Sequence, residues 1–326
     1  MAPLYLAVDA GGTRTTCVLA DESQMLARVQ TGSIKRMRVS ADVAQANLDA
    51  AFAELEQAAH TKLRGVVRTC IGIAGESVPL VRDWITNAFG NRVGGDLVLI
   101  GDIEIALDAA FERERGVLVL AGTGSNVAAR ADDGTVYNVG GWGPVLGDQG
   151  SGYWIGREAL RRAFISLDEQ RPSRLLDAVM HMWSADSFAD VVQIAHAVPP
   201  PDFSRLSEVI AELAAEGDAV CAAQLQRAGH ELAGQALLAM KRVHSRETLQ
   251  RNLIAKWGGI PPPAWTPPAV ACAGSVLAYV EPVREAMTAA IQAVWPDAQV
   301  QDGVVEPVMG ALWRARQVAE HADAVL

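Results

Sequence analysis

One pattern constrains the fold of this chain more than any other: a strand, a glycine turn, a second strand, a turn and a third strand occur in that order twice. An apolar run at residues 4–9 is broken by paired glycines and resumes at residues 14–20. The pattern restarts at residues 117–121, breaks at a Gly-Thr-Gly-Ser turn and resumes at residues 126–131. Glycines between apolar runs adopt the positive φ that tight hairpins need. The repeat predicts two similar halves whose glycine turns face each other across a cleft.

The first half continues with alternating helices and strands. After the opening hairpin come a third strand, a helix, a strand, a helix, a strand and a helix, at residues 25–30, 41–60, 66–73, 78–89, 97–100 and 103–111. The order βββαβαβα predicts an α/β fold in which a mixed sheet has helices on both faces.

The second half is longer and more helical. Its third strand (residues 135–139) is followed by a glycine-rich loop (140–152) and a helix (153–165). After these come an alanine-rich helical segment (173–256), a last buried strand (269–273) and two further helices, which begin at residues 276 and 307. We expect an N-terminal domain at 1–112 and a larger C-terminal domain at 113–326 with a helical insertion at about 155–256. The C-terminal helix, about 313–326, either stays in the second domain or packs back onto the first.

The first glycine turn has the composition of a phosphate site. A turn of this kind points backbone N–H groups outward, and such groups form a concave cradle for an anion. Asp9 ends the preceding strand, so its carboxylate would lie beside the anion and hold Mg²⁺, through water. The alternative is an ordinary hairpin with a polar residue at its end.

The loop at residues 140–152 contains six glycines in thirteen residues. So many glycines let backbone approach a ligand closely. Trp142 would anchor the loop and Asp148 lies in its middle, which favours a ligand-facing role over a flexible connector.

Composition excludes several classes of function. The chain has 326 residues, half of them hydrophobic, and a net charge of −10, which argues against a nucleic-acid or anionic-membrane surface. No apolar run reaches the roughly 20 residues that span a bilayer, and nothing at the N-terminus resembles a signal peptide. The four cysteines are far apart without a Cys-x-x-Cys pair, so no zinc or iron–sulfur site is indicated. We expect a cytoplasmic protein with free thiols.

Several motifs, taken together, resemble those of the BadF/BadG/BcrA/BcrD-type ATPase family, which includes N-acetylglucosamine kinase and belongs to the sugar kinase/Hsp70/actin superfamily. They occur in the family's order. The two glycine turns lie at residues 8–13 and 121–126, and the two halves of the glycine-rich loop at 140–143 and 147–151. An adenosine motif (Cys-Ala-Gly-Ser-Val) follows at 272–276 and a closing P-x-x-G-A signature at 307–311. One Gly-Gly-Thr would mean little, but motifs in register along the chain are specific.

The resemblance implies two RNase H-like (actin-like ATPase) domains around an interdomain cleft, where MgATP and a small-molecule sugar substrate meet. By matched position Asp102 is the catalytic base; the competing role is a helix cap. The residues implied to bind the nucleotide and its Mg²⁺ are Asp9, Gly11, Gly12, Thr13, Gly122, Thr123, Gly124, Ser125, Gly274 and Ser275. Those implied to bind the substrate are Lys35, Ala74, Gly75, Asp102, Thr123, Gly141, Trp142 and Asp148.

One departure from the family concerns the substrate. Sugar kinases of the family carry asparagine in a G-S-x-N loop after the third strand, where this chain reads Gly-Ser-Ile-Lys at residues 32–35. Lys35 only donates hydrogen bonds and adds charge, and Arg36 and Arg38 lie next to it. The loop either binds an anionic group, such as the lactyl carboxylate of N-acetylmuramic acid, or forms a solvated basic rim.

The favoured function is transfer of the γ-phosphate of ATP to a hydroxyl, which we expect to be the 6-hydroxyl, of an amino sugar such as N-acetylglucosamine or glucosamine. A BadF-type activator without sugar kinase activity would need cysteines for an iron–sulfur cluster, and a zinc-containing ROK kinase would need a cysteine cluster. A sugar sensor would carry a DNA-binding segment. A homodimer is compatible with the helical region.

Overall fold

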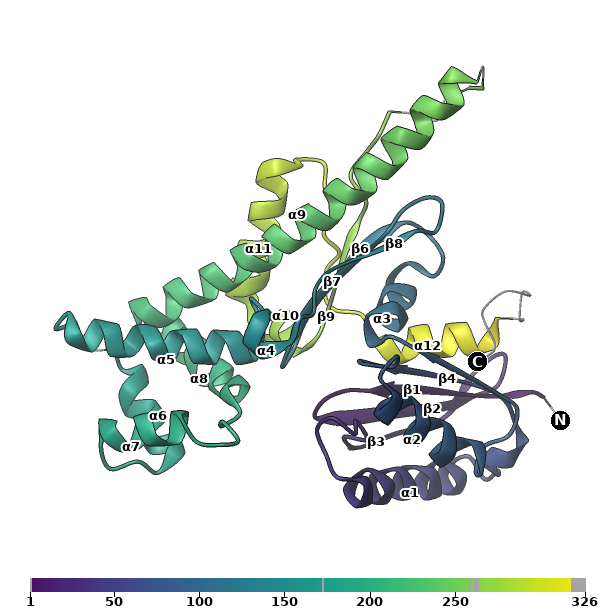
Figure 1. The fold of residues 1–326 in the computed structure, drawn as a ribbon, viewed down its shortest axis with the longest axis horizontal. Helices are drawn as coiled ribbons and strands as arrows, with labels where there is room; N and C mark the ends of the chain where they lie inside the picture. The colour runs from purple at the N-terminus through teal and green to yellow at the C-terminus, as the bar shows by residue number, and fades with distance from the viewer. Residues whose placement is uncertain (1, 172, 258, 261–263, 318–326) are drawn as a thin grey trace. The chain divides into compact units, whose positions relative to one another are not determined.

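The first sheet carries the opening hairpin at its centre. In the computed structural model, which describes residues 2–171, 173–257, 259–260 and 264–317 (Figure 1), its strand order is β3-β2-β1-β4-β5. The strands are β1 (Leu4–Ala10), β2 (Arg14–Ala20), β3 (Met25–Gly32), β4 (Val66–Ile73) and β5 (Asp96–Ile100). The strands β1, β2 and β3 pair antiparallel, whereas β4 runs parallel to both β1 and β5. The predicted mixed sheet is confirmed.

Helices cover both faces of this sheet, as the βββαβαβα order predicts (Figure 1). They are α1 (Ala41–Ala58), α2 (Pro79–Gly90), α3 (Asp102–Phe111) and α12 (Pro307–Arg316), with a 3₁₀ turn, η1 (Leu63–Gly65). One core packs α1 and α2 against one face, and a second core packs α3 and α12 against the other. Ser40 caps α1, because its hydroxyl accepts a hydrogen bond from the Val43 N–H at 3.3 Å.

The helix α12 returns the end of the chain to the first sheet. Contacts divide the chain into one unit formed by residues up to Glu114 together with those from Val305 onward, and a second unit at Arg115–Val304. Gly310 fits tightly on α3, since a Cβ there would lie 1.8 Å from the Ile105 carbonyl oxygen. Arg314 pairs at 2.6 Å with the buried Asp108 of α3. The C-terminal helix spans Pro307–Arg316, and of the segment expected at about 313–326, residues 318–326 lie outside the described residues.

The second sheet repeats the first only in part. Its order is β8-β7-β6-β9, with β6 (Gly116–Ala121), β7 (Ser125–Arg130), β8 (Val136–Gly140) and β9 (Val270–Ala273). The antiparallel and parallel pairings match those of β3-β2-β1-β4. Where β5 adds a fifth strand to the first sheet, an isolated parallel bridge joins Val270 and Val300. The repeated strand–turn–strand pattern is confirmed, and the second sheet is one strand narrower in the described part of the chain.

A long helix, α9 (Ala219–Lys256), is the spine of the second unit. It packs on the sheet and on α5 and α11, and its end extends beyond the other elements of its unit (Figure 1). The other helices are α4 (Gly143–Leu146), α5 (Gly152–Asp168), α6 (Leu175–Trp183), α7 (Phe188–Ala195), η2 (Phe203–Arg205), α8 (Leu206–Ala215), α10 (Ser275–Tyr279) and α11 (Glu281–Val294). The turn α4 was not expected within the glycine-rich loop.

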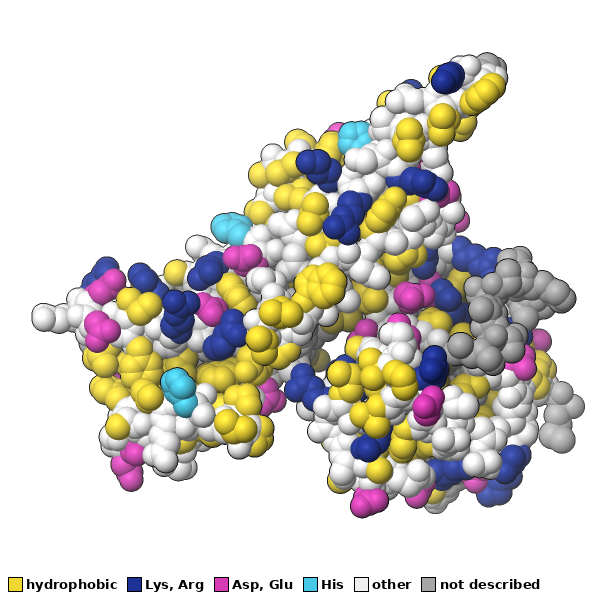
Figure 2. Space-filling view, in the orientation of Figure 1, with side chains coloured by type: hydrophobic (Ala, Val, Ile, Leu, Met, Phe, Trp, Pro, Cys, Tyr) yellow, Lys and Arg dark blue, Asp and Glu magenta, His cyan; other side chains and the backbone are white. Residues whose placement is uncertain are grey.

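Apolar side chains are exposed on the extended end of α9 (Figure 2), among them Leu249, Leu253 and Trp257. They recur every four residues, so they lie along one side of the helix. Although α9 is long, none of the helices in the described ranges is both long and apolar enough to cross a membrane.

Candidate functional site

Three parallel strands of the first unit end at the same edge of the sheet, and the predicted site residues lie there. Asp9 of β1 pairs with Gly72 of β4, which pairs in turn with Ile100 of β5. Gly75 and Asp102 follow these strands directly, as does Ala74. The ends of parallel strands are where side chains from different segments converge. The structure therefore brings together the predicted metal residue, the predicted base and two predicted substrate residues.

The two carboxylates at this edge repel each other. The pKa of Asp9 is raised to about 7, first by burial and then by the nearby Asp102 carboxylate, while the Arg14 guanidinium opposes both effects. Burial also raises the pKa of Asp102, and the positive charge of Lys35 opposes that rise. Carboxylates that are held out of water and close together are common at catalytic sites, and they are rarely kept for stability alone.

Asp102 begins α3 rather than standing before it. The residue in the cap position is Gly101, and Asp102 Oδ1 accepts a hydrogen bond from the Ile103 N–H at 2.9 Å. Its carboxylate thus also satisfies a donor of the first helical turn, so the role weighed against catalysis is partly present. Nearby, the Glu76 carboxylate lies 3.9 Å from the position of a Cβ at Gly101 and adds to the rise in the pKa of Asp102.

The residues at this edge fit a bound Mg²⁺. The cation prefers oxygen ligands and keeps several waters, so one or two carboxylates suffice to hold it. The raised pKa values of Asp9 and Asp102 mean that a nearby cation would relieve their repulsion. In the described ranges no group of three His, Cys, Asp or Glu side chains forms a closed metal site. This arrangement suits a metal that arrives with its water and a phosphate ligand.

The first glycine turn is open and flanked by positive charge. The last paired residues of its hairpin are Ala10 and Thr15. A Cβ at Gly11 would lie 2.9 Å from the Arg14 carbonyl oxygen, so the turn requires glycine there. Gly12, Thr13 and Arg14 are exposed to solvent. The turn presents its backbone outward, as a phosphate cradle needs.

The basic loop after β3 is firmly anchored beside this turn. The Ser33 hydroxyl donates to the Gly11 carbonyl oxygen at 2.9 Å, and the Ile34 N–H donates to Thr15 Oγ1 at 3.2 Å. The Asn47 amide of α1 donates to the Ser33 carbonyl oxygen at 2.9 Å. Ser33 and Ile34 are buried, so the loop is a fixed part of the first unit.

The second glycine turn, in the other unit, is closed by hydrogen bonds. Its last paired residues are Ala121 and Ser125. The Gly122 N–H donates to the Gly124 carbonyl oxygen at 2.9 Å, and the Gly122 carbonyl oxygen accepts from the Gly152 N–H at 2.8 Å. The Thr123 carbonyl oxygen accepts from Tyr153 N–H at 3.3 Å. The turn is thus joined to the start of α5.

Asp148 of the glycine-rich loop lies against this turn. Its side chain is buried, its backbone has φ +60°, and its Oδ2 is 3.0 Å from the position of a Cβ at Gly124. The Ser125 hydroxyl donates to the Gln149 carbonyl oxygen at 2.9 Å. Asn126 lies against Gly141, and its Oδ1 is buried without a hydrogen-bond partner in the described part of the chain. Glycine is needed at Gly141, where the Asn126 amide leaves no room for a Cβ.

The adenosine motif joins the second turn within the same unit. Gly274 has φ +92°, and a Cβ there would lie 2.4 Å from the Ala121 carbonyl oxygen. The Ser275 backbone nitrogen and hydroxyl are both 3.8 Å from the position of a Cβ at Gly122. The predicted nucleotide residues of the second unit therefore form one cluster.

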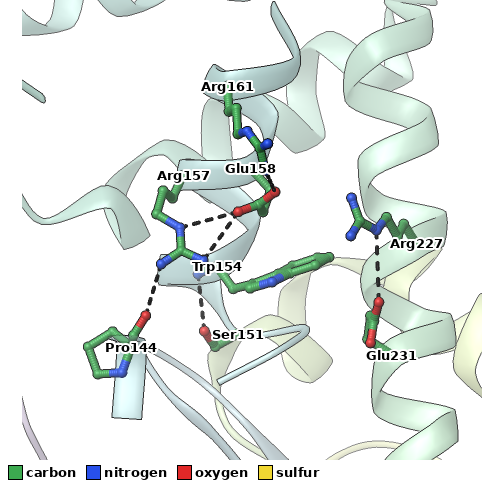
Figure 3. Close-up of polar contacts among 8 residues, drawn as sticks. All are labelled: Pro144, Ser151, Trp154, Arg157, Glu158, Arg161, Arg227 and Glu231. Carbon is green, nitrogen blue, oxygen red and sulfur yellow. Dashed lines mark hydrogen bonds and ion pairs between the residues drawn. The ribbon is translucent and has the colours of Figure 1, made fainter. Parts of the chain in front are cut away.

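Arg157 of α5 ties down the turn that carries Trp142. Its guanidinium donates to the Pro144 carbonyl oxygen at 2.9 Å and to Glu158 at 3.2 Å (Figure 3). Trp142 is 74 % exposed, and its neighbours Val145 and Leu146 are also exposed. No local sequence pattern predicts this contact, because Pro144 and Arg157 are separated by most of the loop.

The four cysteines are all buried free thiols. Burial raises the pKa of each, to about 12 for Cys17, Cys70 and Cys221 and to about 11 for Cys272. Buried thiols with raised pKa values are poor nucleophiles and poor metal ligands.

Comparison with known proteins identifies the family. The model of the BadF/BadG/BcrA/BcrD ATPase family matches residues 6–315, and the chain belongs to this family. The resemblance drawn from the ordered motifs is confirmed.

Two curated relatives and one solved structure are similar to the chain. It is 31% identical over 170 residues to an N-acetylmuramic acid/N-acetylglucosamine kinase of Clostridium acetobutylicum, covering 50% of this chain and 55% of the relative. It is 28% identical over 190 residues to an N-acetyl-D-glucosamine kinase of Dictyostelium discoideum, covering 54% and 59%. The matches thus span little more than half the length of either relative. A crystal structure described as a putative N-acetylglucosamine kinase from Chromobacterium violaceum aligns with TM-score 0.72 and 24% identity over 97% of this chain and 99% of that one, and it has the same fold.

Proposed function

We propose that this protein is an ATP-dependent sugar kinase. It transfers the γ-phosphate of MgATP to the 6-hydroxyl of an amino sugar such as N-acetylglucosamine or glucosamine. The observation that carries the proposal is the placement of Asp102 beside Asp9 and the open glycine turn, in a chain of an ATPase family. The names of the two curated relatives point to the same class of substrate.

Asp102 acts as the general base in this proposal. Its carboxylate takes the proton of the attacking hydroxyl while a bond forms between the sugar oxygen and the γ-phosphorus. The bond from that phosphorus to the oxygen bridging to the β-phosphate breaks, and ADP leaves with the electron pair. The raised pKa of Asp102 makes its carboxylate a stronger base than an ordinary aspartate, as general base catalysis requires.

The glycine turns and the adenosine motif bind the nucleotide in this proposal. The outward-facing backbone at Gly11, Gly12 and Thr13 binds phosphate oxygens. Asp9 holds the water shell of Mg²⁺, which when bound neutralises charge on the phosphates. In the second unit the turn from Gly122 to Ser125 binds further phosphate oxygens, and Gly274 lets the adenosine approach the backbone.

A second candidate substrate is an acidic amino sugar such as N-acetylmuramic acid. It is favoured by the charge of Lys35, which acts on Asp102 and so lies close enough to reach a substrate held there. One curated relative is named for both N-acetylmuramic acid and N-acetylglucosamine. A carboxylate on the substrate would pair with Lys35, whereas a neutral sugar would offer the Lys35 ammonium no charged partner.

A substrate panel tests the function and separates the two candidates. ADP release is measured with N-acetylglucosamine, glucosamine and N-acetylmuramic acid, for the wild type and for Lys35→Asn. We expect turnover of at least one of these sugars, and Lys35→Asn should raise the KM of the acidic sugar more than that of the neutral ones if the loop binds its carboxylate. Equal effects on all three sugars would exclude the acidic-sugar candidate. No turnover with any amino sugar would refute the proposed function.

A further inference from the structure

The basic loop presents two cations to two different parts of the candidate site. Lys35 acts on Asp102, at the end where a substrate hydroxyl would lie. Arg38 lies at the other end, with its Nε 3.9 Å from the position of a Cβ at Gly12. The loop therefore does not form one undivided basic patch, because Arg38 faces the phosphate turn.

Arg38 is held in place by its backbone, while its guanidinium is exposed. Its N–H donates to the Lys35 carbonyl oxygen at 2.8 Å, which closes a turn just before α1. No carboxylate or carbonyl within the described ranges accepts a hydrogen bond from the Arg38 side chain. The neighbouring Arg36 differs, since its guanidinium donates to the Val39 carbonyl oxygen at 2.7 Å and so stabilises the loop itself.

A second arginine lies near the same glycine turn as Arg38. Arg14 lies on the other flank of the same turn and acts electrostatically on Asp9. Two arginines thus flank a glycine turn whose backbone is open, and the planar, multi-donor guanidinium matches the oxygens of a phosphate better than an ammonium does.

We propose that Arg38 is a catalytic residue that binds the γ-phosphoryl group as it is transferred. The proposal rests on the proposed kinase function and adds a residue that its motifs do not contain. The guanidinium donates to the equatorial oxygens of the phosphoryl group, where negative charge must be held while the bond to the β-phosphate breaks. In this proposal Lys35 lies near the sugar hydroxyl that accepts the phosphoryl group, whereas Arg38 binds the phosphoryl group itself.

Kinetics of Arg38 variants provide the first test. Arg38→Ala should lower kcat by about 100-fold, as removal of one preorganised donor typically does, and leave the KM of the sugar within about two-fold, because the residue does not contact the acceptor. Arg38→Lys should recover only part of the loss, and added guanidinium ion should restore part of the kcat of Arg38→Ala. The matched control is Arg82→Ala, which removes a half-buried arginine of α2 that pairs with its neighbour Asp83 at 3.6 Å.

Binding measurements test the residue without relying on turnover. Calorimetry compares ADP with a non-hydrolysable ATP analogue, each with Mg²⁺. Arg38→Ala should weaken binding of the analogue by about ten-fold and leave ADP within about two-fold, since only the analogue carries a γ-phosphate. If no sugar is phosphorylated by the wild type but this difference persists, the kinase proposal fails and the phosphate contact stands. A variant that keeps both the wild-type kcat and the wild-type preference for the analogue overturns the role of Arg38.

Discussion

The two glycine turns share a strand pattern but differ in their surroundings. The first is open, lies beside Asp9 and Asp102, and has arginines on its flanks. The second is tied to α5 and to the adenosine motif by backbone and hydroxyl contacts. The same local structure therefore occurs in two settings: beside charged side chains in the first unit, and within a network of backbone contacts in the second.

The carboxylates of the two units show the same contrast. Burial raises the pKa of Asp9 and Asp102 in the first unit. In the second unit burial acts on Asp133 too, but the Thr135 N–H and Arg246 outweigh it and lower its pKa to about 2. The hydrogen bonds of Asp133 stabilise the fold of the second unit, whereas Asp9 and Asp102 of the first unit keep raised pKa values where chemistry is proposed.

The largest effect expected is on turnover. Asp102→Asn removes the proposed base while keeping its size, and kcat should fall by at least about 100-fold, the usual contribution of general base catalysis. Nucleotide affinity, measured by calorimetry, should change little. The matched control is Asp133→Asn in the second unit, which should leave kcat within about two-fold. A near wild-type kcat for Asp102→Asn would show that Asp102 is not the base, and the proposed chemical difference between the two turns would then fail.

The next effect concerns the shapes of the two turns. Gly274→Ala places a Cβ against the Ala121 carbonyl oxygen at a positive φ, so the free energy of unfolding should fall by about 2–4 kcal/mol. Gly12→Ala meets only the end of the Arg38 side chain, at 3.9 Å, and should change the unfolding free energy by less than about 1 kcal/mol. Chemical denaturation of both variants measures the difference. Equal losses would mean that the first turn is as closely packed as the second.

The smallest effects expected have opposite signs in the two units. Asp9→Asn removes a partly buried charge and should raise Tm, because burial disfavours the ionised form. Asp218→Ala should lower the unfolding free energy by about 1 kcal/mol, since Asp218 accepts hydrogen bonds from Val220 and Cys221 N–H at 3.0 Å and caps α9.

The pH dependence of Asp218→Ala provides a control for this last pair. Burial of Asp218 is outweighed by its hydrogen bonds from Cys221, Ser173 and Arg174, so its folded-state pKa is lowered. The stabilisation it provides is therefore present above the ordinary carboxyl pKa and lost as pH falls through the lowered folded pKa. Thermal scans of the wild type and Asp218→Ala should converge in acid. A fall in Tm for Asp9→Asn at neutral pH would contradict the contrast between the units.

Much of the fold could be predicted from the sequence because its signals are local. The apolar runs at β1 and β6, the glycine turns and the Ser40 cap all depend on neighbouring residues. The turn α4 was missed because its glycines and Pro144 read as loop, and its tie to Arg157 involves a backbone carbonyl that has no sequence signature. Nor could the sequence predict that, in the described part of the chain, the second sheet has a single bridge at Val300 where the first sheet has its fifth strand. Such a bridge depends on pairing rather than on composition.

The candidate site divides in the same way. Asp9 and the first turn could be read from adjacent residues, and Asp102 was placed by the ordered motifs of the family. The approach of Arg38 to Gly12 could not be predicted, because the hydrogen bonds of Ser33 and Asn47 fold the loop back. The roles of Lys35 and Asp102 stay predictions for the experiments above.

The return of α12 to the first sheet affects how the protein is made on the ribosome. Val308, Ala311 and Leu312 complete a core with Ala7 and Ile105, which belong to the first part of the chain to emerge. The helix that begins with Asp102 therefore lacks its packing partner until α12 has been translated. Since domains usually fold as units during synthesis, the second unit can form its core before the first is complete. The core that packs beneath the helix beginning with Asp102 is therefore completed only when α12 is available.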